Sequence, residues 1–360
     1  MLWGLGALGS QVLKAAVGVH SISVVGVIDH NPGYAGKEVG SVFPETRGLG
    51  FKIEPTLDAC LAGLSAPAEI VFHMTESFMP RIQDQLELAL SRRLNVISAA
   101  ESMFHPALRH PEAAARLNRV AMEKGVRITG CGINPGFVFD SLVLALARVS
   151  TAITGITASR VVDVTAGPDD LNHVGIGLWP DEFRTKLAAG RVVGHMGFPE
   201  SIAAVAEHVG LPLDHIEQSW RPRTSPLPVE SSLGILEPGK VTGIDQEGKG
   251  FVGEREAITM RFTAQYKPEQ HGLVQMDQIT IEGRHRVHAT VSPSSASTLG
   301  AALMMINAAN ELCELAPGLH SVLSLSLGGA LREGFRLALD PSRAASPERI
   351  WLVRRNAGFV

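Results

Sequence analysis

Short apolar runs alternate with helix-like segments over the first 137 residues of the chain. The runs are rich in β-branched residues, as buried strands are, and occupy residues 21–29, 69–75, 95–100 and 126–132. Between them, apolar residues recur every three or four positions, as on one face of a helix, over residues 9–18, 81–93 and 110–125. This strand–helix alternation predicts a parallel, doubly wound sheet.

The pattern changes after residue 137. Apolar and polar residues then alternate, as in an antiparallel sheet with one wetted face, over residues 156–166, 257–266, 275–283 and 286–292. Helices are predicted over residues 141–149, 180–190 and 199–210, and a long apolar helix between residues 294 and 318. The proline-rich residues 221–232 are expected to form an irregular connection.

Composition restricts the classes of partner. The chain has 19% charged residues and a formal net charge of −4, which gives no basic field to hold a nucleic acid. It has no run of about 20 apolar residues and no signal-peptide pattern, so we expect no membrane partner and a cytoplasmic protein. Cys60, Cys131 and Cys313 are far apart and lack metal-ligand spacing, which predicts neither a disulfide nor a metal site.

Gly4, Gly6 and Gly9 form a G-x-G-x-x-G motif at the start of the chain. In dinucleotide-binding folds such glycines permit a tight turn, a close approach to the pyrophosphate and close packing of the following helix. A helical segment follows at once, and Asp29 ends the next predicted strand twenty residues after Gly9, the spacing of a ribose-binding carboxylate. These features predict a site for NAD or NADP. Asp29 favours NAD because its charge would repel a 2′-phosphate.

Cofactor-binding residues are expected in this loop and at the ends of the strands: Gly4, Leu5, Gly6, Ala7, Leu8, Gly9, Asp29, His30, Asn31, Thr75, Ala99 and Asn134. His30, Asn31 and Lys37 are polar groups that would also accommodate a 2′-phosphate, so NADP stays open. Because only three residues precede Gly4, the first strand is expected to be short, held by its neighbours and less stable than a full strand.

Two predicted strands run directly into unusual residues. Residues 95–100 lead into Glu101, and residues 126–132 lead into Asn134, Pro135 and Phe137. Ligands of open α/β sheets bind outside the carboxyl ends of the strands, so Glu101 is expected to face the nicotinamide half of the cofactor. Taken alone, Glu101 is equally consistent with an acid that complements a helix dipole.

Seven segments resemble the native amine dehydrogenases and 2,4-diaminopentanoate dehydrogenase, a group similar in fold to dihydrodipicolinate reductase. They are WGLGALG, GVIDHNPGYAGKEVG, NVISAAES, GCGINPGFVFD, ASRVVDVT, GHMGFPES and MINAANELCELAPGL, in the order and spacing of that group over residues 1–327. The resemblance implies an α/β fold: a Rossmann domain, then an α+β domain with an open, mainly antiparallel sheet that forms a homodimer. It also implies NAD(P)-dependent interconversion of an amine with a ketone and ammonia, with Glu101 as the catalytic carboxylate.

The expected domains are a dinucleotide-binding domain over residues 1–137, a substrate and dimerisation domain over 138–293, and a C-terminal helix and tail over 294–360 that packs between or back onto them. The last thirty residues contain no motif to which a role can be assigned. For the substrate pocket we expect Phe137 and Phe139 as walls and His195 from the second domain, with Thr165 and Trp179 as weaker candidates. Each also fits a structural role, the aromatic rings as core and the histidine as a hydrogen-bond partner.

Departures from the relatives narrow the substrate. The chain lacks the paired-histidine and lysine signature of dihydrodipicolinate reductase, and it has VSPSSAST where relatives often place a Gly-Asp turn. Few arginines occur in the expected substrate segments, where a carboxylate would call for a guanidinium. We therefore expect simple aliphatic or alicyclic amines and ketones, in a direction that the sequence does not determine. The alternatives are 2,4-diaminopentanoate dehydrogenase, another ketone or imine oxidoreductase, and a non-catalytic NAD(P)-binding sensor.

Overall fold

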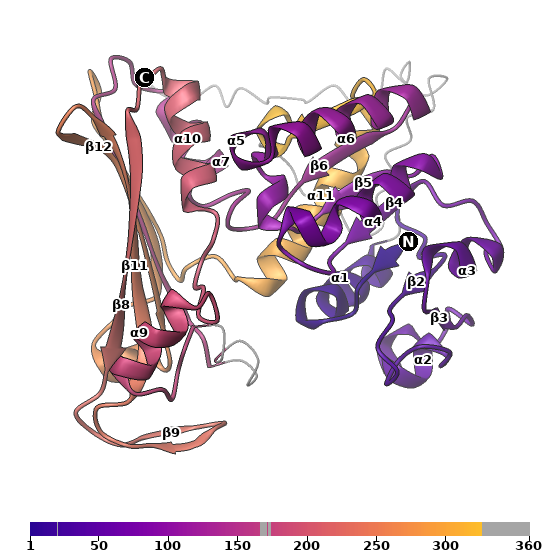
Figure 1. Cartoon of the computed structure of the whole chain (residues 1–360), viewed down its shortest axis with the longest axis horizontal. Coiled ribbons are helices and arrows are strands. Elements are labelled where there is room, and N and C mark those ends of the chain that lie inside the picture. Colours follow the sequence, from indigo (N-terminus) through magenta and orange to yellow (C-terminus); the bar gives the residue numbers. More distant parts are fainter. Residues whose placement is uncertain (20, 166–170, 172–173, 326–360) are drawn as a thin grey trace, which may run out of the picture.

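A seven-stranded parallel sheet forms one half of the molecule (Figure 1). The structure is a computed structural model and describes residues 1–19, 21–165, 171 and 174–325. The strand order is β15-β6-β5-β4-β1-β2-β3. The strands are β1 (Leu2–Trp3), β2 (Val27–Ile28), β3 (Ile53–Glu54), β4 (Ile70–His73), β5 (Asn95–Ser98), β6 (Arg127–Gly130) and β15 (Gly318–Ser321).

Helices cover both faces of this sheet. On one face, α1 (Ala7–Gly18) packs against α11 (Thr298–Glu314). The other face is covered by α3 (Leu57–Ala62), α4 (Met79–Ser91) and α6 (Pro111–Lys124). Each helix is amphipathic, so its buried residues recur at helical spacing, as Val12, Leu13 and Ala16 do in α1. The predicted doubly wound parallel sheet is confirmed.

The two-residue strand β1 lies near the centre of the sheet. Leu2 pairs with Val27 of β2 on one side and with Phe72 of β4 on the other. The strand predicted over residues 21–29 is shortened to Val27–Ile28, because its neighbours β1 and β3 each offer only two residues for pairing. The glycine loop follows β1 directly and is placed at the carboxyl edge of the sheet.

A six-stranded mixed sheet forms the other half, in the order β14-β13-β7-β12-β11-β8. Among the described strands of this sheet, β7 and β12 make its one parallel pair. The strands are β7 (Gly155–Asp163), β8 (His215–Thr224), β11 (Val241–Val252), β12 (Arg255–Gln265), β13 (Met276–Glu282) and β14 (Val287–Val291). A hairpin of β9 (Val229–Ser231) and β10 (Gly234–Leu236) stands apart from it. The predicted open, mainly antiparallel sheet is confirmed.

The second sheet is packed on one face. Along β7, Ile156 and Ala158 are buried whereas Thr157 and Ser159 are half-buried, because successive side chains point to opposite faces. The apolar face packs against α7 (Ser141–Ala147), α9 (Pro180–Ala188) and α10 (Phe198–Val209), which lie between the two sheets in Figure 1. None of the described helices covers the outer, polar face in this view.

The irregular connection predicted for residues 221–232 is wrong over much of its length. Residues 221–224 end β8, and residues 229–231 form β9. Pro222 is tolerated in β8 because this is an edge strand, where a missing N–H need not break the ladder.

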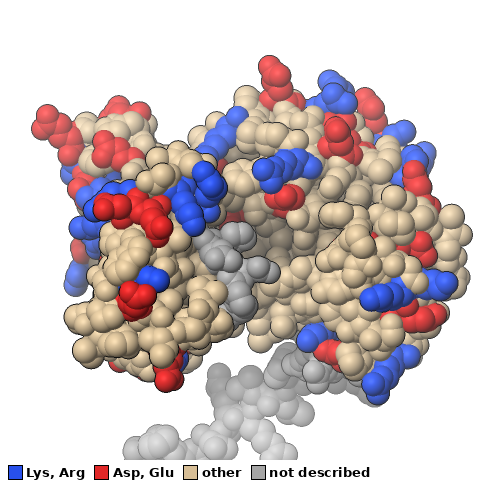
Figure 2. Space-filling view, turned by 60° about the horizontal axis from the view of Figure 1, so that its bottom comes forward, with Lys and Arg blue, Asp and Glu red and all other residues tan. Residues whose placement is uncertain are grey.

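The segment after residue 293 returns to the first sheet. Helix α11 lies against α1, and β15 adds a parallel strand beside β6. The last thirty residues lie outside the described part of the chain. No helix in the described part is long and apolar enough to cross a bilayer. On the face shown in Figure 2, acidic and basic side chains are intermixed, and the molecule is hollowed between its halves.

Candidate active site

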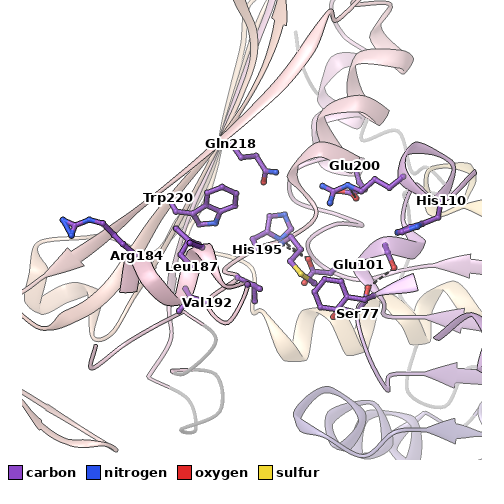
Figure 3. A pocket seen from close by; sticks show the side chains of 17 residues that line it. Ser77, Glu101, His110, Arg184, Leu187, Val192, His195, Glu200, Gln218 and Trp220 are labelled. Atoms are coloured by element: carbon purple, nitrogen blue, oxygen red, sulfur yellow. Dashed lines mark hydrogen bonds and ion pairs between the residues drawn. The ribbon is translucent and has the colours of Figure 1, made fainter. Parts of the chain in front are cut away.

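A cavity of about 460 Å³ lies between residues of the two halves (Figure 3). The first half contributes Ser77, Phe78 and Glu101, at the carboxyl ends of β4 and β5. The second half contributes residues of α9, α10, β8 and the connection between α9 and α10. They are Leu187, Val192, Val193, His195, Met196, Glu200, Gln218 and Trp220. Most of this lining is apolar, so charged groups within it are poorly hydrated.

Glu101 follows β5 in a 3₁₀ turn, Glu101–Met103, and its side chain is 25% exposed. The main-chain N–H of Met196 donates to Oε2 at 2.9 Å. Burial raises the pKa of Glu101 to about 7; the Met196 N–H opposes this rise, and the negative charge of Glu200 adds to it. Both protonation states are therefore populated near neutral pH, as a general acid or base requires.

His195 lies beside this carboxylate. Its Nδ1 is 3.8 Å from Glu101 Oε2, longer than a hydrogen bond, and the ring packs against Phe139 and Phe198. Burial lowers the pKa of His195 to about 3, helped by the positive charge of Arg160, so the imidazole is neutral. Within the described residues, Nε2 has no hydrogen-bond partner.

Arg109 and Glu200 form an ion pair on the cavity wall. Arg109 ends the short helix α5 (Pro106–Arg109) of the first half, and Glu200 lies in the first turn of α10 in the second. The distance from Nε to Oε1 is 2.9 Å, and a second contact joins Nη2 to Oε2 at 3.5 Å. The side chain of Glu200 is 5% exposed and that of Arg109 is 47% exposed. Burial raises the pKa of Glu200, and Arg109 opposes the rise.

The glycine loop has the geometry of a pyrophosphate site. Gly4 has a φ of +97°, and a Cβ there would lie 2.5 Å from the Met74 carbonyl oxygen. A Cβ on Gly9 would overlap the Gly4 carbonyl, so neither position admits a side chain. Gly6, at the start of α1, is exposed, and a Cβ there would meet nothing within 4 Å. The open space faces a helix N-terminus, which fits a dinucleotide cofactor.

Asp29 braces this loop from the end of β2. Its Oδ2 accepts from the Leu5 N–H at 2.6 Å, and its Oδ1 accepts from the Asn31 N–H at 2.8 Å. A carboxylate has further lone pairs, so these bonds leave room for a ribose hydroxyl. His30 and Asn31 are exposed beside it, while Ala7 and Leu8 open α1.

Thr75 and Ala99 lie at the ends of β4 and β5 and are fixed by one buried network. The Thr75 hydroxyl donates to Gln85 Oε1 at 2.6 Å and lies 2.9 Å from His73 Nε2, while the Ala99 N–H donates to the His73 carbonyl. His73 Nδ1 is 3.0 Å from the Ser98 hydroxyl.

Asn134, after β6, is held by other residues. With its amide nitrogen donating to the Ile133 carbonyl, its oxygen accepts from Arg160 Nε at 3.3 Å. The structure thus places the predicted cofactor residues along one edge of the first sheet, where their role stays a prediction.

Of the residues predicted for the substrate pocket, His195 lines the cavity and the other four do not. Phe139 is fully buried beside His195, because the turn before α7 places its ring in the core against His195 and Phe198. Phe137, two residues earlier in the chain, is half-buried. Thr165 donates to Asp163, and Trp179, 42% exposed, precedes α9.

Several cavity residues were not anticipated. Gln218 and Trp220 alternate inward along β8, a strand that the sequence pattern did not predict. Arg109 precedes one predicted helix and Glu200 lies in the first turn of another, positions where a charged residue is ordinarily solvated. The one available signal was the alternation of Ile216, Gln218 and Trp220 with more polar residues, which the polar Gln218 and the nearby Pro212 and Pro222 obscure.

A family model of the 2,4-diaminopentanoate dehydrogenase C-terminal domain matches residues 137–340. The chain belongs to this family. Among curated proteins of the 2,4-diaminopentanoate dehydrogenase type, that of Acetoanaerobium sticklandii is 29% identical over 341 residues, covering 93% of this chain and 95% of the relative. An amine dehydrogenase of Streptomyces virginiae is 23% identical over 352 residues, covering 92% and 97%.

The family fold is also found among solved structures. An amine dehydrogenase from Mycobacterium smegmatis matches with a TM-score of 0.77 at 22% identity, covering 93% of this chain and 96% of that one. The family resemblance, the fold class and the expectation of an enzyme of the dehydrogenase class are confirmed.

Proposed function

We propose that this 2,4-diaminopentanoate dehydrogenase family member is an NAD(P)-dependent amine dehydrogenase, which aminates a ketone with ammonia and oxidatively deaminates the product amine. The observation that carries the proposal is Glu101, a carboxyl group with a pKa of about 7 in a mostly apolar cavity at the carboxyl edge of the first sheet. The names of the two curated relatives support it. The diaminopentanoate activity of the first relative is the alternative.

A bound nicotinamide exchanges a hydride with the amine-bearing carbon of the substrate. In the chain, Gly4–Gly9 would hold the pyrophosphate, and Asp29 the adjoining ribose. Glu101 as a carboxylate pairs with the substrate ammonium and accepts its proton. After releasing that proton to solvent, Glu101 takes a second proton from the water that attacks the iminium carbon. It passes this proton to the amino group, so that ammonia leaves and the ketone forms, while the apolar lining excludes other water.

For the cofactor we propose NAD in preference to NADP. The Asp29 carboxylate is 9% exposed, and a 2′-phosphate beside it would meet like charge. The exposed His30 and Lys37 nearby moderate this preference. Comparison of the dissociation constants of NADH and NADPH, by quenching of protein fluorescence, tests it.

For the assembly we propose a homodimer formed through the outer face of the second sheet. In support, that face is broad, and none of the described helices covers it in Figure 1. Light scattering during size-exclusion chromatography tests this, and a monomer would contradict it. The domain boundaries 1–137, 138–293 and 294–360, the cytoplasmic location and the absence of nucleic-acid or membrane partners stay predictions.

The deciding experiment is a panel of aliphatic and alicyclic ketones, assayed with NADH or NADPH in the presence and absence of ammonia. We expect cofactor oxidation that requires both ketone and ammonia. Oxidation without ammonia would instead indicate a ketone reductase. Cofactor binding with no turnover of any ketone would indicate a non-catalytic NAD(P)-binding sensor.

A further inference from the structure

The cavity presents cationic side chains that are already paired. Among its described lining residues, the arginines are Arg109 and Arg184. Arg184 is 64% exposed and contacts Asp181, which is 98% exposed, at 2.6 Å, so solvent screens this pair at the rim. Arg109 instead contacts the buried Glu200 through two of its nitrogens.

The burial of Glu200 makes its pairing hard to replace. A carboxylate removed from water keeps its charge at an acceptable cost only when a partner is in contact with it. A substrate carboxylate that displaced Glu200 from Arg109 would leave Glu200 buried and unpaired. One that bound without displacing Glu200 would lie close to two acidic groups, Glu200 and Glu101, in a poorly hydrated space.

The pair also lies at a defined place relative to the chemistry. Figure 3 shows Glu200 and His110 on one side of Glu101, with Leu187 and Trp220 on the opposite side. A substrate whose reacting carbon lies at Glu101 therefore extends one substituent towards the apolar side chains and the other towards the ion pair. The substituent next to the pair meets a neutral, internally satisfied surface instead of a free guanidinium.

We infer that Glu200 determines specificity by occupying Arg109, so that substrates bearing a carboxylate are excluded and uncharged ketones, with their amines, are accepted. This inference rests on the proposed function and deepens it by naming the substrate class. A carboxylate-bearing substrate, which the name of the relative 2,4-diaminopentanoate dehydrogenase denotes, belongs to the class that the inference excludes for this chain.

The test uses three ketones of similar size: 4-oxopentanoate, its methyl ester and 2-hexanone, each with ammonia and reduced cofactor. For the wild-type protein, kcat/KM for the ester exceeds that for the acid by about 100-fold or more, as the juxtaposition of like charges implies. In Glu200→Gln the acid-to-ester ratio of kcat/KM rises by about tenfold or more, because the positive charge of Arg109 is then free to pair with the carboxylate of the acid.

Two further variants assign the effect to the pair. In the double variant Arg109→Gln with Glu200→Gln, the acid-to-ester ratio falls again, because the guanidinium is gone. The rim variant Arg184→Gln is the matched control and leaves the ratio at the wild-type value. An ion pair that serves only to join the two halves would reduce turnover of all three ketones equally in Glu200→Gln and leave the ratio unmoved, which would overturn the inference.

The comparison of 4-oxopentanoate with its methyl ester in the wild-type protein does not depend on the folding of any variant. Amination of 4-oxopentanoate as efficient as that of its ester would by itself refute the exclusion of carboxylates. Failure to aminate any of the three ketones would contradict the proposed function, a separate result. Thermal-shift titration with the acid and the ester then tests exclusion directly, and binding of the acid as tight as that of the ester would refute it.

Discussion

The main-chain N–H of Met196 donates a 2.9 Å hydrogen bond to the carboxylate of Glu101. These residues are 95 positions apart in the sequence and come from the two halves of the molecule. The bond stabilises the charged form of Glu101, whereas burial favours the neutral form. The position of one half against the other therefore sets the proton affinity of the proposed catalytic group.

Glu101→Gln removes the proton acceptor while nearly preserving shape. We expect kcat to fall by about 10²–10⁴-fold, the usual contribution of general acid–base catalysis, with an unchanged dissociation constant for the cofactor. Steady-state amine oxidation and fluorescence titration measure the two quantities. Glu123→Gln, an exposed acid on α6, is the control and retains activity. Full turnover in Glu101→Gln would eliminate Glu101 as the catalytic group.

The pH dependence of amine oxidation reports the same group. Because the ionised carboxylate accepts the proton, kcat/KM is expected to rise with pH through about 7. In Glu200→Gln the rise of kcat/KM should occur at lower pH, because the substitution removes a negative charge that raises the pKa of Glu101. If kcat/KM of Glu200→Gln rises at the same pH as that of the wild-type protein, Glu200 does not act on the titrating group.

The glycines of the loop separate folding from cofactor binding. Gly6→Ala places a methyl group in open space, so we expect a loss of less than about 1 kcal/mol in stability but at least a tenfold weaker cofactor affinity. Gly18→Ala, at the exposed end of the same helix, is the control for both quantities. Gly9→Ala should cost stability, about 1–3 kcal/mol, because its Cβ meets backbone. Urea unfolding and titration with NADH measure these effects, and wild-type affinity in Gly6→Ala would argue against a pyrophosphate at the loop.

Acid should destabilise the first half through His73. Burial lowers the pKa of His73 to about 4 from its ordinary value of about 6.5, so between these values the unfolded chain binds a proton that the folded chain does not. The stability that the neutral ring provides is complete above about pH 6.5 and is lost as the pH falls towards 4, by up to about 3 kcal/mol. Urea midpoints over this range should depend less steeply on pH in His73→Gln. The exposed His30→Gln should keep the wild-type dependence, and equal slopes in all three proteins would contradict the prediction.

The alternation of strands and helices was readable from the sequence because it is local. Each buried strand is a short β-branched run, and each helix repeats apolar residues over a few turns, so neighbouring residues carry the signal. The glycine loop and the strand-end position of Glu101 follow from the same pattern. β8 was missed because its proline, Pro222, is tolerated at a sheet edge, a position that the sequence does not reveal.

The lining of the cavity was decided by tertiary packing. Phe139 and His195 both looked like pocket residues, yet the ring of Phe139 is buried beside that of His195. Arg109 and Glu200 looked like ordinary helix-end charges. They form an ion pair, with Glu200 buried, because α5 of one half meets α10 of the other. Contacts between residues so distant in the sequence depend on how whole elements pack against one another. The sequence by itself therefore determined the elements and the chemistry they carry, whereas only the packing of the two sheets decided which side chains share a cavity and at what proton affinity.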